Sequence, residues 1–394
     1  MDFDLSWILL GLPLAFVLGW LASRMDLRQL RIENRQAPKA YFRGLNFLLN
    51  EQQDQAIDAF IEAVQNDPDT QELHFALGNL FRRRGEYQRA VRVHEHLLGR
   101  GDLSRADRDR AQHALAQDFL RAGLLDRAEA ALQKLEGTRY ENEARLSLLA
   151  IYERSREWAQ AAAVAQKLDD AEQASYETRR AHHLCEQADE QIGAGDMAAA
   201  ERLLEQAAEL APDAPRPAID LAALQLRSGN AAAAFATLHA LSERAPLALP
   251  LYAAMLQQSA VAAGRAEEAL ALLQHRYAQS PSIDVLEAVI ALGGVPAALP
   301  GAQPATPHTL VPRDGYIAHL AQQPSLVAAS RWLAGERFEH EQFHPQVQRA
   351  LDQATRPLMR YRCAACGFEA HQHFWHCPGC QAWDSYPPRR VEEL

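Results

Sequence analysis

The sequence predicts an all-α protein in three parts: an N-terminal transmembrane helix, a superhelical solenoid of helix pairs, and a small C-terminal metal knuckle. Three observations predict this architecture. They are an uncharged apolar run near the N-terminus, a helical pattern that repeats along the middle of the chain, and four cysteines in its last tenth. The composition agrees, because Ala, Leu, Gln, Glu and Arg are abundant and aromatic residues make up only 7% of the 394 residues.

The apolar run extends from Leu5 to Ala22 and contains no charged residue. At about 1.5 Å per residue, a helix of this length crosses roughly one hydrocarbon core. Asp2 and Asp4 stand where a cleaved signal peptide carries positive charge. We therefore expect residues 1–23 to be a retained transmembrane anchor, with a cleaved signal and a soluble core helix as the alternatives.

Basic residues directly follow the apolar run and none precedes it. The juxtamembrane segment 24–36 holds four arginines: Arg24, Arg28, Arg31 and Arg35. The positive-inside rule therefore predicts a single pass through a membrane by residues 5–22, with everything beyond residue 23 in the cytoplasm. The spacing also places the four arginines on one helical face, which either contacts anionic headgroups or is simply solvated.

Helix pairs repeat along residues 37–294. Aligning YFRGLNFLLNEQQDQAIDAF with HFALGNLFRRRGEYQRAV matches Gly44 with Gly78 and Ala56 with Ala90, and this offset of 34 residues is the tetratricopeptide period. Weaker copies follow, so we expect seven pairs. Each pair exposes an apolar face that only its neighbours can cover, and the array should therefore stack into a superhelix with a concave groove for peptides or protein surfaces.

Degenerate helical repeats are expected in residues 314–357. Segment 314–323 would pair with 283–293 at the end of the array, and 325–336 would pair with 344–356. An insertion at residues 295–313 separates the first two of these segments. Its prolines exclude a helix there: Pro296, Pro300, Pro304, Pro307 and Pro312.

Polar side chains within the array could contact a ligand or could simply be solvated or buried helix residues. Asn79, Arg82 and Arg83 should face the groove by the usual geometry of such repeats, as a basic patch or as a solvated helix face. Cys185 is expected to be a small buried residue. Four histidines are expected to be ordinary helix residues rather than ligands: His94, His96, His182 and His183.

The segment 358–394 carries cysteines at metal-ligand spacing. They form two C-x-x-C pairs separated by ten residues: Cys363, Cys366, Cys377 and Cys380. Two such turns supply the four corners of a tetrahedron. Gly367 can adopt the positive φ that a knuckle needs, and bound metal would supply much of the folding energy of so short a segment. Two disulfides are the alternative, and they conflict with a reducing cytoplasm.

Four thiolates bind a single iron ion, as in rubredoxins, or zinc as the alternative. The strings C-x-x-C-G and C-P-x-C resemble rubredoxin knuckles, with Tyr361, Phe368 and Trp375 available to surround the centre. Because all four positions are filled by thiolates, no coordination position is open for hydrolysis. The nearby histidines are expected to be surface residues rather than ligands: His371, His373 and His376.

Charge and motifs narrow the function classes. The net charge of −11 argues against nucleic-acid binding. The sequence holds no Gly-rich phosphate loop, G-x-S-x-G or H-E-x-x-H motif, so we do not expect an enzyme. Self-association into a homo-oligomer is compatible with the repeats, although nothing requires it. A redox protein whose knuckle cycles one iron remains the main alternative to a binding scaffold.

An anchor, a tetratricopeptide array and a terminal rubredoxin-like knuckle, in this order, resemble the lipopolysaccharide assembly protein B family of Gram-negative bacteria over essentially the full chain. The similarity is greatest in GLNFLLNEQQDQAIDAF, LGNLFRRRGEYQRA, AGLLDRAE and the two cysteine strings, while residues 295–312 depart from the family pattern. The resemblance implies an inner-membrane adaptor that promotes degradation of the deacetylase LpxC by the membrane protease FtsH. It also implies that the protein gathers other lipopolysaccharide assembly proteins, and that the four cysteines bind iron or another metal.

Overall fold

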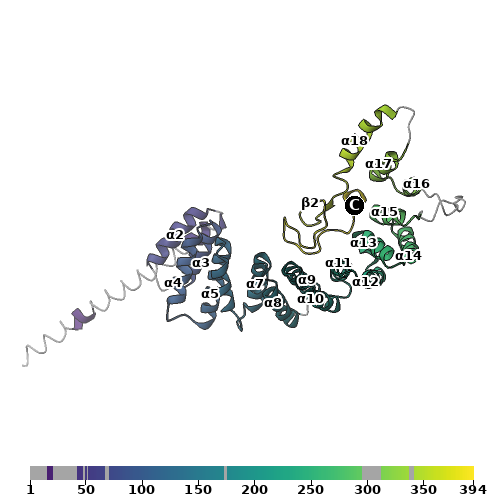
Figure 1. The fold of residues 1–394 in the computed structure, drawn as a ribbon. Coiled ribbons are helices and arrows are strands. Elements are labelled where there is room, and N and C mark those ends of the chain that lie inside the picture. The colour runs from purple at the N-terminus through teal and green to yellow at the C-terminus, as the bar shows by residue number, and fades with distance from the viewer. Residues whose placement is uncertain are drawn as a thin grey trace, which may run out of the picture. The chain divides into compact units, whose positions relative to one another are not determined.

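The structure is a computed structural model, and it describes residues 16–20, 42–47, 49–50, 52–66, 71–172, 175–294, 312–336 and 341–394. In these residues the chain is helical almost throughout, with two short strands near the C-terminus (Figure 1). The chain divides into two compact units, residues 1–155 and 156–394.

The first unit is built from consecutive antiparallel helices after a helical turn at residues 42–47. They are α2 (Gln53–Asn66), α3 (Gln71–Arg83), α4 (Tyr87–Gly99), α5 (Arg105–Ala122), α6 (Leu125–Gln133) and α7 (Glu141–Ser155). Helix α5 shows why the boundaries fall where they do. The Ser104 hydroxyl accepts a hydrogen bond from the Asp107 N–H at its start, and Gly123, with φ +74°, ends it in the left-handed conformation.

A glycine sets the close approach of α3 and α4. A Cβ atom on Gly78 would lie 2.5 Å from Nε2 of His94, closer than any real contact allows. His94 cannot easily move aside, because it is fully buried and its Nδ1 lies 2.5 Å from the Asp118 carboxylate. The expectation that a small residue in the first helix lets its partner approach is confirmed here.

Two of the residues expected at the groove turn out to brace the helices. Arg82 donates hydrogen bonds to the Asp118 carboxylate at 2.9 Å and to the Ala114 carbonyl at 3.0 Å, and so ties α3 to α5. Asn79 accepts a hydrogen bond from the same guanidinium at 2.5 Å. Arg82 is therefore not part of an open basic patch, whereas Arg83 is exposed. The physical reason why Arg82 turns away from the groove is the opposite charge on buried Asp118.

The second unit continues the array of paired helices. It contains α8 (Trp158–Glu172), α9 (Glu177–Ala194), α10 (Met197–Leu210), α11 (Pro215–Arg227), α12 (Ala231–Arg244), α13 (Leu249–Ala262) and α14 (Ala266–Gln279). Large side chains such as Phe235, Tyr252 and Tyr277 are fully buried between neighbouring helices. Cys185 of α9 is completely buried in an apolar cluster, as expected, and burial raises its pKa well above the usual value.

The last helices occupy the stretches where degenerate pairs were expected. They are α15 (Ile283–Ala291), α16 (Pro312–Gln322), α17 (Leu326–Ala334) and α18 (His344–Thr355). Short 3₁₀ turns lie before α13 at Pro246–Ala248, before α18 at Glu341–Phe343, and near the C-terminus at Val391–Glu393. The exclusion of Pro312 from a helix was wrong. It is the first residue of α16, where a missing backbone N–H costs nothing. The other prolines of the insertion lie outside the described residues.

The expected anchor falls mostly outside the described part of the chain. In that part, no helix combines the length and the apolar character that crossing a bilayer requires. Of residues 5–22 the structure describes only 16–20, which are helical, and the basic segment 24–36 lies entirely outside the described residues.

Candidate metal centre

The two cysteine pairs lie on two similar turns. The first turn joins the antiparallel strands β1 (Tyr361–Arg362) and β2 (Glu369–Ala370). Gly367 closes it with φ +78°, and its N–H donates to the Cys363 carbonyl at 2.9 Å. In the second turn, the N–H of Gln381 donates to the Cys377 carbonyl at 2.8 Å, and Gln381 takes φ +60°. The positive φ predicted for Gly367 is therefore present, and a glutamine adopts the equivalent conformation in the other knuckle.

The four sulfur atoms converge on one point. All of them lie within 4.8 Å of one another, with 3.8 Å between Cys363 and Cys380 and 3.7 Å between Cys366 and Cys377. A tetrahedral site with metal–sulfur distances of about 2.3 Å has sulfur–sulfur edges of about 3.8 Å. The first cysteine of each pair is buried and the second is exposed. The arrangement thus has the dimensions of a tetrathiolate metal site with one side towards solvent.

Backbone N–H groups around the sulfurs favour thiolates. Cys363 Sγ accepts hydrogen bonds from the N–H groups of Ala365 and Cys366, and Cys377 Sγ accepts them from Gly379 and Cys380. The exposed sulfurs each accept one further N–H bond, from Phe368 and from Ala382. Charge-assisted bonds of this kind stabilise the anionic form that binds a metal. The donors present therefore fit a bound cation.

The pKa values of the thiols separate because the sulfurs are so close. Burial opposes ionisation of Cys363, but hydrogen bonds from Ser385 and the backbone outweigh it and lower its pKa to about 6. At Cys366 the N–H of Phe368 favours the thiolate, yet burial and the other three sulfurs raise its pKa to about 12. Without a cation only some of the sulfurs can be charged at neutral pH, and a divalent or trivalent metal ion would remove this conflict.

The nearby histidines direct their ring nitrogens to backbone carbonyls. Nε2 of His373 lies 3.1 Å from the backbone carbonyl oxygen of Tyr386, and Nε2 of His376 lies 2.9 Å from that of Gln381. Among the described residues, the group able to hold a metal ion contains the four cysteines alone. The expectation of surface histidines is right only for His371, because His373 and His376 are half-buried by the surrounding aromatic rings.

The knuckle is docked on the helices of its own unit. His182 of α9 stacks on Trp383 with 4.8 Å between ring centroids, and its Nε2 lies 2.9 and 3.0 Å from the two Asp384 carboxylate oxygens. Trp158 of α8 meets the edge of the same indole at 6.2 Å. Trp375 packs against the apolar core of the helices rather than around the sulfurs. His182 is thus a docking residue and not an ordinary helix residue.

These docking residues could not be recognised in the sequence. His182 and Trp383 are 201 positions apart, and neither belongs to a motif. The aromatic residues of the tail were assigned to the metal centre because of their proximity in sequence. Of these, Tyr361 is buried in the knuckle, whereas Phe368 remains 44% exposed. The available signal was the excess of aromatic residues in so short a segment, which indicated contacts beyond the knuckle itself.

Comparison with family models agrees with this division of the chain. Residues 361–387 match the model of a rubredoxin metal binding domain. Residues 73–109 and 191–259 match tetratricopeptide repeat models. The prediction of an all-helical tetratricopeptide solenoid with a C-terminal rubredoxin-like domain is therefore confirmed.

Full-length relatives are also found. Lipopolysaccharide assembly protein B of Escherichia coli K12 is 30% identical over 394 residues, covering 98% of both chains. The protein of the same name from Haemophilus influenzae is 26% identical over 409 residues, again covering 98% of both chains. Among solved structures, the Naa15/Naa10 complex with HypK-THB aligns at 13% identity with a TM-score of 0.43, over 82% of this chain and 47% of that chain, which is too distant to support a functional argument. On the basis of the full-length similarity to the E. coli protein, this chain belongs to the lipopolysaccharide assembly protein B family.

Proposed function

We propose that this protein is a membrane-anchored, non-enzymatic adaptor that regulates lipopolysaccharide biosynthesis. In this proposal it promotes degradation of the deacetylase LpxC by the protease FtsH, and it holds other lipopolysaccharide assembly proteins at the inner membrane. The observation that carries the proposal is the combination of full-length family similarity with a thiolate knuckle docked on a repeat array. Such an array offers surfaces for proteins, and the four cysteines would fill every coordination position of a tetrahedral metal.

We further propose that Cys363, Cys366, Cys377 and Cys380 together bind one iron ion, with zinc as the alternative. The sulfur spacing and the N–H bonds to the sulfurs support this assignment. When bound, the metal supplies a structural cross-link and no open coordination position. Its role in the adaptor is to keep the knuckle folded and therefore docked on α8 and α9.

The anchor gives the adaptor its location in this proposal. Residues 1–23 cross the inner membrane once, segment 24–36 lies at the cytoplasmic surface, and the repeats at 37–294 and 314–357 project into the cytoplasm. Confinement to the membrane of the protease raises the effective concentration of the two proteins without requiring a tight contact. The uncharged run and the arginines that follow it support this placement.

The half-life of LpxC tests the proposed function directly. We would measure it in cells that contain the protein, in cells depleted of it, and in depleted cells supplied with the Cys363→Ser/Cys366→Ser variant. The proposal predicts a longer half-life on depletion and no recovery with the variant. An unchanged half-life on depletion would reject the adaptor role, while full recovery by a metal-free variant would reject only the role of the knuckle.

One observation favours a second function, electron transfer by a rubredoxin-type centre. Cys366 and Cys380 are exposed, so two of the four sulfurs are accessible to a redox partner. This function requires bound iron. A red protein that is bleached by a reductant and recovers in air would support it, and a colourless zinc form would rule it out.

A further inference from the structure

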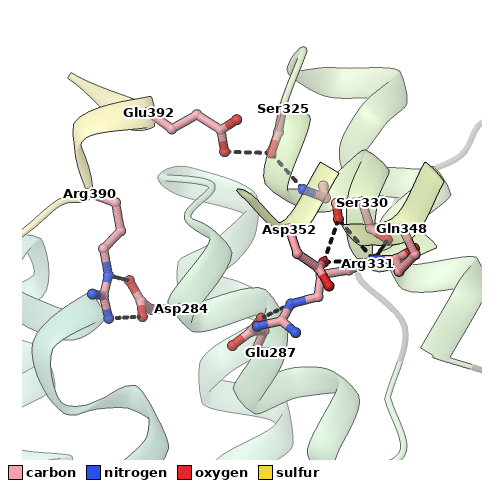
Figure 2. A network of polar contacts seen from close by, with 10 residues as sticks. Asp284, Glu287, Ser325, Ser330, Arg331, Gln348, Asp352, Arg390 and Glu392 are labelled. Carbon is pink, nitrogen blue, oxygen red and sulfur yellow. Dashed lines mark hydrogen bonds and ion pairs between the residues drawn. The ribbon is translucent and has the colours of Figure 1, made fainter. Parts of the chain in front are cut away.

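The last residues of the chain bind the start of helix α15. Arg390 forms a bidentate ion pair with Asp284, with N–O distances of 2.8 and 3.0 Å (Figure 2). The carboxylate of Glu393 accepts a hydrogen bond from the Ile283 N–H at 2.6 Å. Ile283 is the first residue of α15, and Ser282 before it makes no side-chain capping bond. Glu393 therefore supplies from 110 residues away the acceptor that a local cap normally supplies.

The neighbouring glutamate does the same for helix α17. One oxygen of Glu392 accepts hydrogen bonds from the N–H groups of Leu326 and Val327, at 2.6 and 3.1 Å. Its other oxygen accepts the Ser325 hydroxyl at 2.7 Å (Figure 2), and Ser325 in turn caps the Ala328 N–H. All three N–H groups at this helix start are thus satisfied, and the negative charge lies at the positive end of the helix dipole.

The same residues are tied to the knuckle. The N–H groups of Val391 and Glu392 donate to carbonyls of residues 360 and 358, which lead into β1. The guanidinium of Arg390 donates to the Met359 carbonyl at 2.8 Å and lies 4.2 Å from the centre of the Tyr361 ring. Tyr361 is one of the buried residues of the knuckle. The position of the tail therefore depends on a folded knuckle.

Helix α15 buries five apolar residues, but α17 and its neighbour α18 bury few apolar side chains of their own. In α18 only Thr355 is buried, and in α17 only Val327, Ala328 and Ser330 are buried. Helix α17 also meets its neighbours through polar groups: Arg331 pairs with Glu287, and Ser330 contacts Asp352 and Gln348 (Figure 2). With so little hydrophobic burial in α17 and α18, the capping bonds at the start of α17 make up a large share of the stability of this pair of helices.

We propose that Arg390, Glu392 and Glu393 form a C-terminal clasp that makes the order of helices α17 and α18, and of the first turn of α15, depend on the folded, metal-loaded knuckle. Loss of the metal unfolds the knuckle, withdraws the two capping carboxylates and releases the ends of α15 and α17. The clasp is thus a conformational device that transmits the metal state of the cysteine site to the last helices of the array. It rests on the metal site proposed above, but not on the adaptor function.

Amide hydrogen exchange of the full-length, metal-loaded protein tests the clasp. In the variant Glu392→Ala/Glu393→Ala, exchange in the first turn of α17 and in α18 should rise by roughly tenfold, the effect of losing two caps. The knuckle and helices α9 to α12 should keep their protection. The matched control is Glu201→Ala/Glu205→Ala on the exposed face of α10, which should leave α17 and α18 unchanged. Unaltered exchange at α17 in the clasp variant would overturn the proposal.

Removal of the metal provides a second test of the clasp. Stripping the metal from the wild type with a chelator should accelerate exchange in the same helices, and in the clasp variant it should add little to the change already present. An equal acceleration in both proteins would show that the coupling does not run through the clasp. Elemental analysis of each sample separates the failure of the metal site from the failure of the clasp. If the chain takes up no metal, the metal dependence of the clasp is overturned. Exchange in the clasp variant then still decides whether the tail caps the helices.

Discussion

The repeat array and the knuckle reach an ordered structure by different means. The array buries large apolar side chains in continuous clusters, such as the one containing Phe235, Tyr252 and Tyr277, and burial of each such residue contributes roughly 1.5–3 kcal/mol. In the knuckle, the buried cluster consists of two tyrosines and two of the cysteines themselves. The array is therefore stabilised by its own packing, whereas the knuckle requires a cross-link through its sulfurs.

Removal of two ligands should have the largest effect. We expect Cys363→Ser/Cys366→Ser to abolish metal binding and to unfold the knuckle, because much of the folding free energy of such a site comes from the metal. Elemental analysis and hydrogen exchange of residues 361–387 would measure both changes. Cys185→Ala is the control, since that buried thiol lies among apolar residues of the array. Metal retained in the double variant would contradict the assignment of ligands.

A substitution in the array should destabilise the first unit and leave metal binding intact. The Cβ atom in Gly78→Ala would meet His94, which Asp118 holds in place, so we expect a loss of about 1–3 kcal/mol in the free energy of unfolding. Chemical denaturation would measure it. At Gly99, also helical, a Cβ atom meets nothing within 4 Å, so Gly99→Ala should be neutral or stabilising. Equal effects at the two positions would refute the close-approach argument.

Loss of the docking contact should have a smaller effect. His182→Ala removes the stack on Trp383 and the hydrogen bond to Asp384, and we expect the docked state to lose about 1–2 kcal/mol. The Asp384 side chain is 46% exposed, so water can replace the lost partner. The measurement is the rate of metal release to a chelator, which should increase. The His182→Phe variant keeps the stacking but loses the hydrogen bond, so its rate of metal release should lie between those of His182→Ala and the wild type.

The smallest expected effect concerns the second knuckle. Gln381 has φ +60° at the place where Gly367 stands in the first knuckle. Replacement by glycine removes a left-handed strain of roughly 1 kcal/mol, so the Gln381→Gly variant should unfold at a slightly higher denaturant concentration in its metal-loaded form. Gln381→Val should shift the midpoint in the opposite direction. A stabilising valine would show that this backbone conformation is not a requirement of the knuckle.

Local patterns allowed much of the fold to be predicted. The repeat that relates Gly44 to Gly78 predicted a close contact between paired helices, and the cysteine spacing predicted a knuckle. Both features are determined by residues near one another in sequence. Helices α15 to α18 lie in the stretches where degenerate continuations of the repeat were expected. Pro312 was misassigned because proline at the first helical position is compatible with a helix.

Contacts between distant segments could not be predicted in the same way. The pairing of His182 with Asp384, and of Glu392 with the start of α17, joins residues with no common motif. Arg82 was expected at the groove from the usual geometry of such repeats, but its guanidinium instead bonds the buried carboxylate of Asp118 on α5 and links the two helices. Such outcomes depend on three-dimensional packing, which a one-dimensional pattern does not contain.

The central claim of this account is that the knuckle is ordered by its metal and the array by its own core. The most direct measurement is amide hydrogen exchange of the full chain before and after complete removal of the metal. We expect residues 361–387 to lose their protection while helices α3 to α7 keep theirs. A knuckle that remains fully protected without metal, or an array that loses protection along its whole length, would contradict the account.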